Sequence, residues 1–305
     1  MRLHRLPPQS FFLVSAVFHY LGPSFAVLLF ARVDVLGVAW LRIASAAALF
    51  ALWRRPWRLV ARMDRSGRWV LVQLGAVLAA MNSLFYLAVD RLPLSTVGAI
   101  EFLGTVLLAA LGVRTRRNVA ALVLTAFGVA TITDIRITGQ PLGFAFAFGN
   151  CALFLLYVIL GHRIANTTST NTTSTSTGSP TSNRGMMSGI DQLGASMLVT
   201  AVMVTPVGLG GALPVFSRPV LLLAGVTVGV CSSVIPYVTD QLAMARLPRA
   251  TFALMLALLP MFGTVIGAVV LRQLPTSQDL LGIALVIAGI AMHQHSSQKG
   301  SSADA

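Results

Sequence analysis

The stretch from Met81 to Phe102, MNSLFYLAVDRLPLSTVGAIEF, decides how this chain is organised. It joins two apolar segments through a polar turn and places a carboxylate, Glu101, within the second segment. Its pattern Leu-Ala-x-x-Arg-Leu-Pro, at residues 87–93, returns at residues 242–248. A repeat at this distance indicates that the chain is made of two related halves.

The composition indicates an integral membrane protein. Of 305 residues, 56% are hydrophobic and 10% are charged, with a mean hydropathy of +0.80, whereas soluble proteins average about 25% charged residues. Apolar runs of about 20 residues can each cross a hydrocarbon core about 30 Å thick. The sequence predicts ten membrane-spanning helices, at residues 11–31, 35–53, 68–89, 93–112, 118–135, 141–161, 189–210, 219–241, 247–271 and 278–294.

Ten spans divide into five and five, and an odd number of crossings gives two related halves opposite orientations in the membrane. We therefore predict an all-α membrane protein whose ten transmembrane helices form two inverted five-helix repeats, residues 11–136 and 141–294. Residues 162–188 are predicted to contain a flexible polar cytoplasmic linker. The reason is that the sequence from Asn166 to Asn183 has almost no apolar side chain to bury.

Positive charge is distributed unevenly along the chain. Sixteen of the 22 Lys and Arg residues lie near the termini or in alternate loops, and five lie in the remaining loops. The positive-inside rule then predicts cytoplasmic N- and C-termini. Because this asymmetry accounts for the net charge of +13, we expect no nucleic-acid partner. Cys151 and Cys231 lie within apolar runs, which favours packing over a disulfide or a metal site.

Two ionisable residues inside apolar spans are the first candidates for function, because such groups are costly in lipid. Glu101 lies eight residues after Pro93, which is about 12 Å along a helix. A carboxyl group in a low-dielectric site has its charged form disfavoured, so we expect Glu101 to line a central cavity and to exchange a proton during transport. The structural alternative is a fixed ion pair with Arg42. Arg42 could instead reach the surface, satisfy freed backbone carbonyls or hold a substrate carboxylate.

Four further residues complete the predicted substrate-binding or proton-binding set: His19, Asn82, Tyr86 and Tyr237. The histidine is either a hydrogen-bonded core residue or a proton-linked group facing the cavity. The other three offer a few polar contacts among apolar neighbours, which suits a small zwitterion or a metabolite with polar and apolar parts. The same residue types also hold helices together in membranes.

Enzyme signatures are missing from the sequence. It contains no G-x-S-x-G, no H-E-x-x-H and no Gly-rich phosphate loop with a lysine, and its Cys and His residues are not spaced as metal ligands. We therefore predict a protein that is not an enzyme, uses no cofactor or metal and is not an ATP-driven pump.

Several motifs together resemble the threonine/homoserine exporter branch of the EamA-type drug/metabolite transporter superfamily. The resemblance covers about residues 11–294, apart from the linker. It implies a central cavity between two repeats and export of small metabolites, amino acids among them, coupled to an ion gradient. The motifs are Trp40-Leu-Arg-Ile43, Arg55-Pro-Trp-Arg-Leu59, Met81-Asn-Ser-Leu-Phe-Tyr86 and Ala99-Ile-Glu-Phe102.

The chain departs from this family pattern at two places in its second half. It has Leu259-Pro260 where the family commonly has Glu-Pro, and Arg272-Gln273 where the family has Gly-Glu. The chain keeps the family's glutamate in the first repeat, at Glu101, and lacks its counterpart in the second repeat. Transport is therefore better supported than threonine or homoserine as the substrate.

The expected function is secondary active export of small metabolites, with neutral amino acids such as threonine and homoserine, or their analogues, as substrates and proton antiport as the coupling. The alternatives are an exporter of apolar or aromatic compounds, including drugs, and a membrane scaffold without transport activity. The expected partners are a small-molecule substrate, the lipid bilayer and a proton gradient, with a homodimer as an allowed assembly. The expected location is the cytoplasmic membrane.

Overall fold

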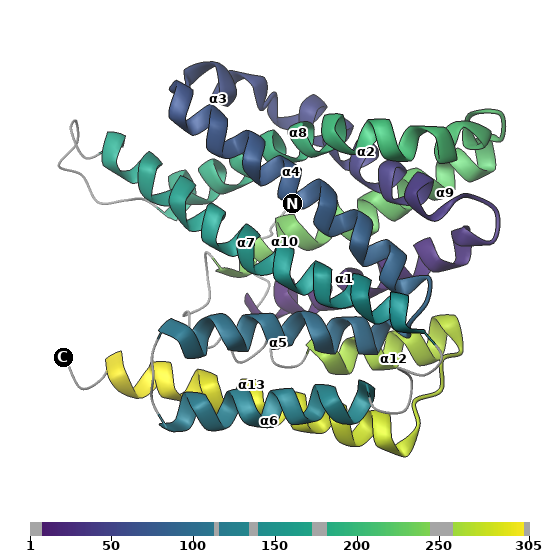
Figure 1. Cartoon of the computed structure of the whole chain (residues 1–305). Coiled ribbons are helices and arrows are strands. Elements are labelled where there is room, and N and C mark those ends of the chain that lie inside the picture. The colour runs from purple at the N-terminus through teal and green to yellow at the C-terminus, as the bar shows by residue number, and fades with distance from the viewer. Residues whose placement is uncertain (1–7, 113–115, 134–139, 173–181, 245–258, 302–305) are drawn as a thin grey trace.

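The structure, a computed structural model, describes residues 8–112, 116–133, 140–172, 182–244 and 259–301. Every regular element in these ranges is a helix (Figure 1). The helices are α1 (Pro8–Phe30), α2 (Val35–Arg54), α3 (Trp57–Arg62), α4 (Arg65–Val89), α5 (Leu94–Gly112), α6 (Arg116–Thr133), α7 (Pro141–Thr172), α8 (Ser182–Phe216), α9 (Pro219–Gly229), the π-helix η2 (Val230–Val234), α10 (Ile235–Met244), α12 (Leu259–Leu271) and α13 (Ser277–Ser301).

The all-helical prediction is confirmed for the described residues, and the helices are those of a multi-pass membrane protein. Five of them are long and apolar enough to cross a membrane: Ser10–Phe30, Val35–Arg54, Arg65–Val89, Ile190–Phe216 and Pro219–Asp240. Shorter apolar segments occupy the positions of the other predicted spans, at Leu94–Gly104, Val119–Thr131, Pro141–Tyr157, Leu259–Leu271 and Ser277–Met292. The start of the ninth predicted span and most of the second Leu-Ala-x-x-Arg-Leu-Pro copy lie outside the described residues.

Three features differ from the predicted pattern. A short helix, α3, lies between the second and third spans, and the eighth span is interrupted by η2. Helix also extends into both ends of the predicted linker, because α7 continues to Thr172 and α8 begins at Ser182. A polar tail can continue an existing helix without the cost of forming a new nucleus. Residues 173–181 lie outside the described part of the chain.

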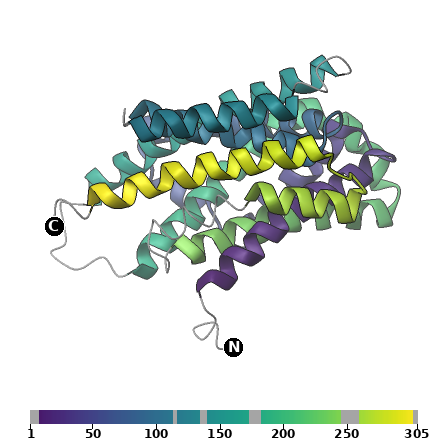
Figure 2. The same ribbon diagram turned by 90° about the horizontal axis from the view of Figure 1, so that it is seen from below.

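The bundle has two sides joined by central helices (Figures 1 and 2). Helices α5, α6, α12 and α13 pack together on one side, and α2, α8 and α9 on the other. The pairs α1–α10 and α4–α7 lie between them. Residues of α1, α4, α7 and α10 therefore lie between the two sides, where they can meet residues of α2 and α5.

The packing pairs are related by exchange of the two halves. Helix α4 packs on α7 as α10 packs on α1, and α5 packs on α7 as α12 packs on α1. Helices α2 and α8, and likewise α6 and α13, pair across the halves. These contacts agree with a duplicated bundle, and the pseudo-two-fold axis in the membrane plane stays a prediction.

Small residues allow the cross-half pairs to approach closely. A Cβ added at Gly37 of α2 would lie 2.6 Å from the carbonyl oxygen of Gly211 on α8, and one at Gly128 of α6 would lie 2.7 Å from the carbonyl oxygen of Gly282 on α13. Helices in lipid associate through such close contacts between small residues. The glycines therefore fix how the two halves are joined.

Candidate functional site

A buried arginine marks the polar centre of the bundle. Arg42 on α2 is only 7% exposed, although it carries a full positive charge. Its Nε donates to the hydroxyl of Ser233 at 3.0 Å, and its Nη2 donates to the backbone carbonyl of Ser232 at 3.3 Å. These two bonds use two of the five N–H groups of the guanidinium. The guanidinium thus has donor capacity left for a further group.

The Ser232 carbonyl is available because of the local chain chemistry. In an α-helix this oxygen would accept the N–H of the residue four positions later, but that residue is Pro236, which has no N–H. The helix instead widens into η2, where Ile235 donates to the carbonyl of Val230. Arg42 therefore satisfies a carbonyl that the proline has freed, one of the roles expected for it from the sequence.

Glycines on two helices let η2 sit against its neighbours. A Cβ at Gly229 would lie 2.7 Å from the carbonyl oxygen of Arg42, and a Cβ at Gly22 would lie 2.6 Å from the Cα of Ser232. Real Cβ atoms do not approach that closely, so any larger residue would push α2 or α1 away from η2. The contact between Arg42 and the π-helix thus depends on these two positions.

Tyr86 on α4 forms the aromatic side of the site. Its ring centroid lies 5.4 Å from Cζ of Arg42, a cation–π distance. Its side chain is fully buried between Phe30 and Phe85, both in edge contact. Within the described structure its hydroxyl has no hydrogen-bond partner, which is costly for a buried polar group. A ligand that accepts from this hydroxyl would remove that cost.

Glu101 on α5 faces the same centre without touching Arg42. The described ion pairs are Arg54–Asp191 and Arg91–Asp90, so the direct Glu101–Arg42 pair considered from the sequence is absent. The two charges interact at longer range. A guanidinium and a carboxylate that are not in contact can each bind one end of a zwitterion.

Tyr20 on α1 lies between the two sides of the bundle near Glu101, with which it interacts electrostatically. Its ring packs on Gly98 of α5 and Gly263 of α12, where an added Cβ would come within 2.9 Å and 2.8 Å of ring or hydroxyl atoms. His19 lies beside it, with ring centroids 5.7 Å apart, and interacts with the charge of Arg42. The structure therefore brings His19 into the cluster.

The other two predicted residues differ in their placement. Tyr237 on α10 belongs to the cluster, because it interacts electrostatically with Arg42 and Glu101. Asn82 is buried on α4, but its amide nitrogen donates to the carbonyl of Leu78 in its own helix at 2.8 Å. Because that bond uses one of its amide N–H groups within α4, Asn82 has fewer donors left for a ligand.

Both departures from the family pattern have structural roles here. Leu259 is buried in the apolar core around α1, α5 and α12. Gln273 accepts the backbone N–H of Leu94 at 3.3 Å with its side-chain oxygen, and so caps the start of α5. Neither position adds a second carboxylate to the polar centre.

Sequence reasoning did not identify Ser232, Ser233 or Tyr20. The signal for the serines was Pro236, because a proline inside an apolar span predicts a freed carbonyl four residues earlier. For Tyr20 no such signal exists, since its position depends on two glycines more than 70 residues away along the chain.

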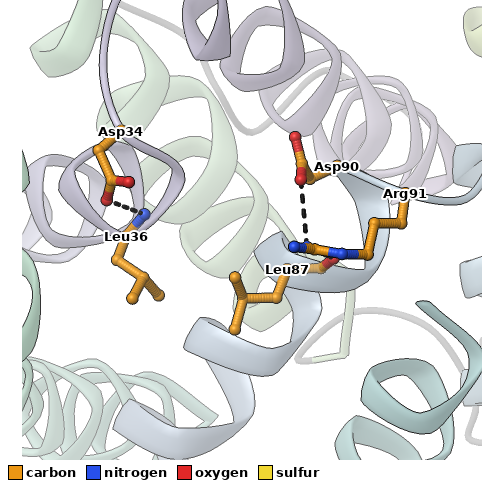
Figure 3. Close-up of polar contacts among 5 residues, drawn as sticks. All are labelled: Asp34, Leu36, Leu87, Asp90 and Arg91. Atoms are coloured by element: carbon orange, nitrogen blue, oxygen red, sulfur yellow. Dashed lines mark hydrogen bonds and ion pairs between the residues drawn. The ribbon is translucent and has the colours of Figure 1, made fainter. Parts of the chain in front are cut away.

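Charged groups at one end of the bundle are satisfied locally and stand apart from this centre (Figure 3). Asp34 caps α2 by accepting the N–H of Leu36 at 2.9 Å. Arg91 pairs with Asp90 at 3.1 Å and donates to the carbonyl of Leu87 at 2.9 Å, which fixes the turn between α4 and α5. These contacts hold turns in place and involve neither Arg42 nor Glu101.

Comparison with known proteins identifies relatives that are transporters. Residues 184–293 match the EamA-like transporter family. The chain is 28% identical over 273 residues to the threonine/homoserine exporter RhtA of Salmonella typhimurium strain LT2, and 27% identical over 273 residues to that of Escherichia coli K12, covering 88% of this chain and 84% of each relative. The resemblance inferred from the sequence motifs is confirmed.

A solved crystal structure supports the fold. It aligns with a TM-score of 0.59 at 17% sequence identity, covering 95% of this chain and 98% of its own. At that identity the likeness concerns the fold alone, and it extends over both halves of the chain.

Proposed function

We propose that this chain, whose residues 184–293 match the EamA-like transporter family, is a secondary active exporter of small zwitterionic metabolites, with neutral amino acids such as threonine and homoserine or close analogues as its substrates. The observation that carries the proposal is the separated pair of Arg42 and Glu101 at the centre of the bundle. Relatives named as threonine/homoserine exporters make the amino-acid class the first to test.

Each end of an α-amino acid has a matching group in the site. Arg42 keeps N–H groups beyond the two that bond Ser232 and Ser233, and a carboxylate accepts from a guanidinium in short, charge-assisted bonds. The Tyr86 hydroxyl, buried beside it, is a second donor. The carboxylate of Glu101 attracts an ammonium group. A small neutral side chain would then lie among the aromatic residues, because pockets of this kind combine few polar contacts with apolar walls.

Proton antiport follows from the same pair. When a substrate ammonium faces Glu101, the charged carboxylate is favoured, and when the substrate leaves, protonation removes the cost of an isolated charge in a low-dielectric site. One carboxylate then binds either a proton or a substrate, which is the requirement for exchange. Exchange between the two sides would use relative movement of the two halves around this site.

A transport assay tests the proposal directly. The purified protein in liposomes is preloaded with a panel of unlabelled amino acids, and uptake of labelled threonine is measured by counterflow, with and without a pH gradient. We expect stimulation by neutral amino acids and further stimulation by the gradient. Equal uptake in empty liposomes and in those loaded with any of the panel would reject amino-acid transport.

A second substrate class follows from the aromatic lining. Tyr20, Tyr86 and Phe85 give the centre a large apolar surface relative to its few polar groups, and such a surface suits aromatic or apolar compounds. The same counterflow assay with aromatic amines in the panel separates the two. Stimulation by amines lacking a carboxylate would favour this second class.

A further inference from the structure

Helix α3 and the adjoining ends of α2 and α4 form a basic and aromatic surface, which we call the arginine collar and define as residues 52–72. Between residues 54 and 68 it contains six arginines and one aspartate. Figure 1 places α3 at one end of the bundle, opposite the connection between α1 and α2. The collar is remote from the polar centre, and transport chemistry does not require it.

Two arginines of the collar are used to fix its shape. Arg54 pairs with Asp191 at 2.7 Å. Arg68 donates to three backbone carbonyls, those of Val60 and Ala61 in the last turn of α3 and that of Met63 just after it, at 3.0 to 3.1 Å. These bonds hold α3 against the start of α4 and satisfy carbonyls that a short helix leaves unpaired.

Three exposed arginines of the collar remain without an ion pair in the described part of the chain: Arg55, Arg58 and Arg65. Arg55 has a left-handed backbone with φ of 51°, a conformation that costs a residue with a Cβ about 1 kcal/mol and usually selects glycine. The one aspartate in this stretch, Asp64, accepts the N–H of Gly67 as a helix cap. The collar therefore presents uncompensated positive charge.

Large apolar side chains accompany this charge. Trp53, Trp57 and Trp69 are at least half exposed, and Leu52 is 81% exposed. Tryptophans with this exposure are typical of the boundary between lipid tails and headgroups. The collar is thus positioned where headgroups lie.

A hollow of about 600 Å³ lies within the collar and is lined by residues from the first part of α4. Its lining residues are Arg65, Ser66, Arg68, Trp69 and Val72. A guanidinium and a hydroxyl suit a phosphate group, whereas the indole and the valine suit the glycerol and upper acyl chain attached to it. A phospholipid carries both the phosphate and the apolar part in one molecule.

We propose that the arginine collar binds the headgroup of an anionic phospholipid such as phosphatidylglycerol, with Arg65 on the phosphate, Arg58 adding to the positive charge of the collar, and Trp69 against the glycerol and acyl region. Basic clusters next to a membrane span attract anionic lipids. If the arginines served only to orient the protein in the membrane, neither the hollow nor the three bonds by which Arg68 fixes α3 would be needed. The site concerns the lipid environment and is independent of the proposed substrate.

Native mass spectrometry of the detergent-purified protein tests this site. The protein is titrated with phosphatidylglycerol or with phosphatidylcholine of the same acyl chains, and bound lipid is counted. We expect wild type to bind phosphatidylglycerol about tenfold more tightly, since each basic residue near the surface contributes about 1 kcal/mol. Equal binding of the two lipids by wild type would overturn the proposal without any variant.

Variants assign the binding to the collar. The double variant Arg58→Gln/Arg65→Gln is expected to lose that preference, and Arg58→Lys/Arg65→Lys to keep part of it, because lysine retains charge without the bidentate geometry. The matched control Arg32→Gln/Arg218→Gln removes two exposed arginines elsewhere on the molecule and should change nothing. A loss of preference in the control equal to that in the collar variant would overturn the assignment.

A soluble competitor distinguishes binding of a lipid phosphate from binding of a small soluble phosphate compound. Glycerol 3-phosphate at millimolar concentration is expected to leave bound phosphatidylglycerol in place, because it lacks the acyl chains that contact Trp69 and Val72. Full displacement by this compound would mean that the hollow takes a soluble phosphate, and the lipid proposal would be wrong.

Discussion

The two halves of the chain contribute different chemistry to the same centre. The first half supplies side chains, Arg42, Tyr86 and Glu101, whereas the second half supplies the carbonyl of Ser232, freed by Pro236, and the hydroxyl of Ser233. The packing pairs of the two halves nevertheless correspond to one another. Two halves with corresponding packing pairs can therefore differ in their chemistry, so that one carries the charged side chains and the other carries the irregular backbone.

This division has a physical reason. A charge buried in a membrane protein is costly, and two carboxylates at one centre would repel each other. The second half places Leu259 in the core and uses Gln273 as a helix cap. Glu101 and Arg42 are then two groups of opposite charge, which is what binding a zwitterion requires.

The largest effect on transport is expected from removing the arginine that joins the halves. Arg42→Met leaves the Ser232 carbonyl without its donor, and an unsatisfied buried group costs about 1–3 kcal/mol. We expect a lower thermal unfolding midpoint and loss of threonine counterflow. Arg42→Lys serves as the comparison, since it keeps the charge and should recover part of the stability. Wild-type counterflow by Arg42→Met would show that the guanidinium does not bind substrate.

Next in size is the effect of removing the titrating group. Glu101→Gln preserves shape and hydrogen bonding but cannot release a proton. We expect a folded protein, judged by its unfolding midpoint, that no longer responds to a pH gradient in the export assay. If gradient-driven export by this variant equals that of wild type, Glu101 is not the coupling residue.

A carboxylate placed in the second half tests whether the asymmetry is required. Leu259→Glu buries an acid in an apolar core, and we expect a loss of about 2–4 kcal/mol in the free energy of unfolding. The volume-conserving control Leu259→Met should cost less than about 1.5 kcal/mol. Unfolding followed by circular dichroism measures both. An acid tolerated as well as methionine would mean that the second half does not exclude charge.

The two serines of the π-helix are expected to differ. Ser233→Ala removes the hydroxyl that accepts from Arg42 and should cost about 1.5–3 kcal/mol, the range for a hydrogen bond to a charged group. Ser232→Ala leaves the backbone carbonyl in place and should cost less. Unfolding midpoints of the two variants, measured side by side, check this order. A larger loss for Ser232→Ala would contradict the role given to its carbonyl.

The smallest effect is expected from the connection between the halves. Deleting residues 174–179, within the polar stretch predicted as a linker, should leave counterflow and the unfolding midpoint unchanged, because a polar connection supplies reach and little packing. Reduced transport at normal membrane levels would indicate that this segment has a specific role.

Much of this architecture could be predicted from the sequence alone. The membrane location, the approximate span positions and the choice of Glu101 and Arg42 as candidates follow from hydropathy and from the cost of burying charge, both of which are local properties. Pro236 in an apolar span is a further local signal, because a proline frees the carbonyl four residues earlier. The resemblance of the sequence motifs to the EamA-type superfamily likewise does not depend on the fold.

Only the tertiary structure decided which groups meet. Arg42 donates to a residue 190 positions away along the chain, and it reaches η2 because Gly229 and Gly22 allow α2 and α1 to approach. The spacing of residues in a sequence carries no information on such contacts, since they depend on how separate helices pack. The Glu101–Arg42 ion pair considered from the sequence is absent among the described residues, because the packing of α5 and α2 brings the two charges only within longer-range interaction.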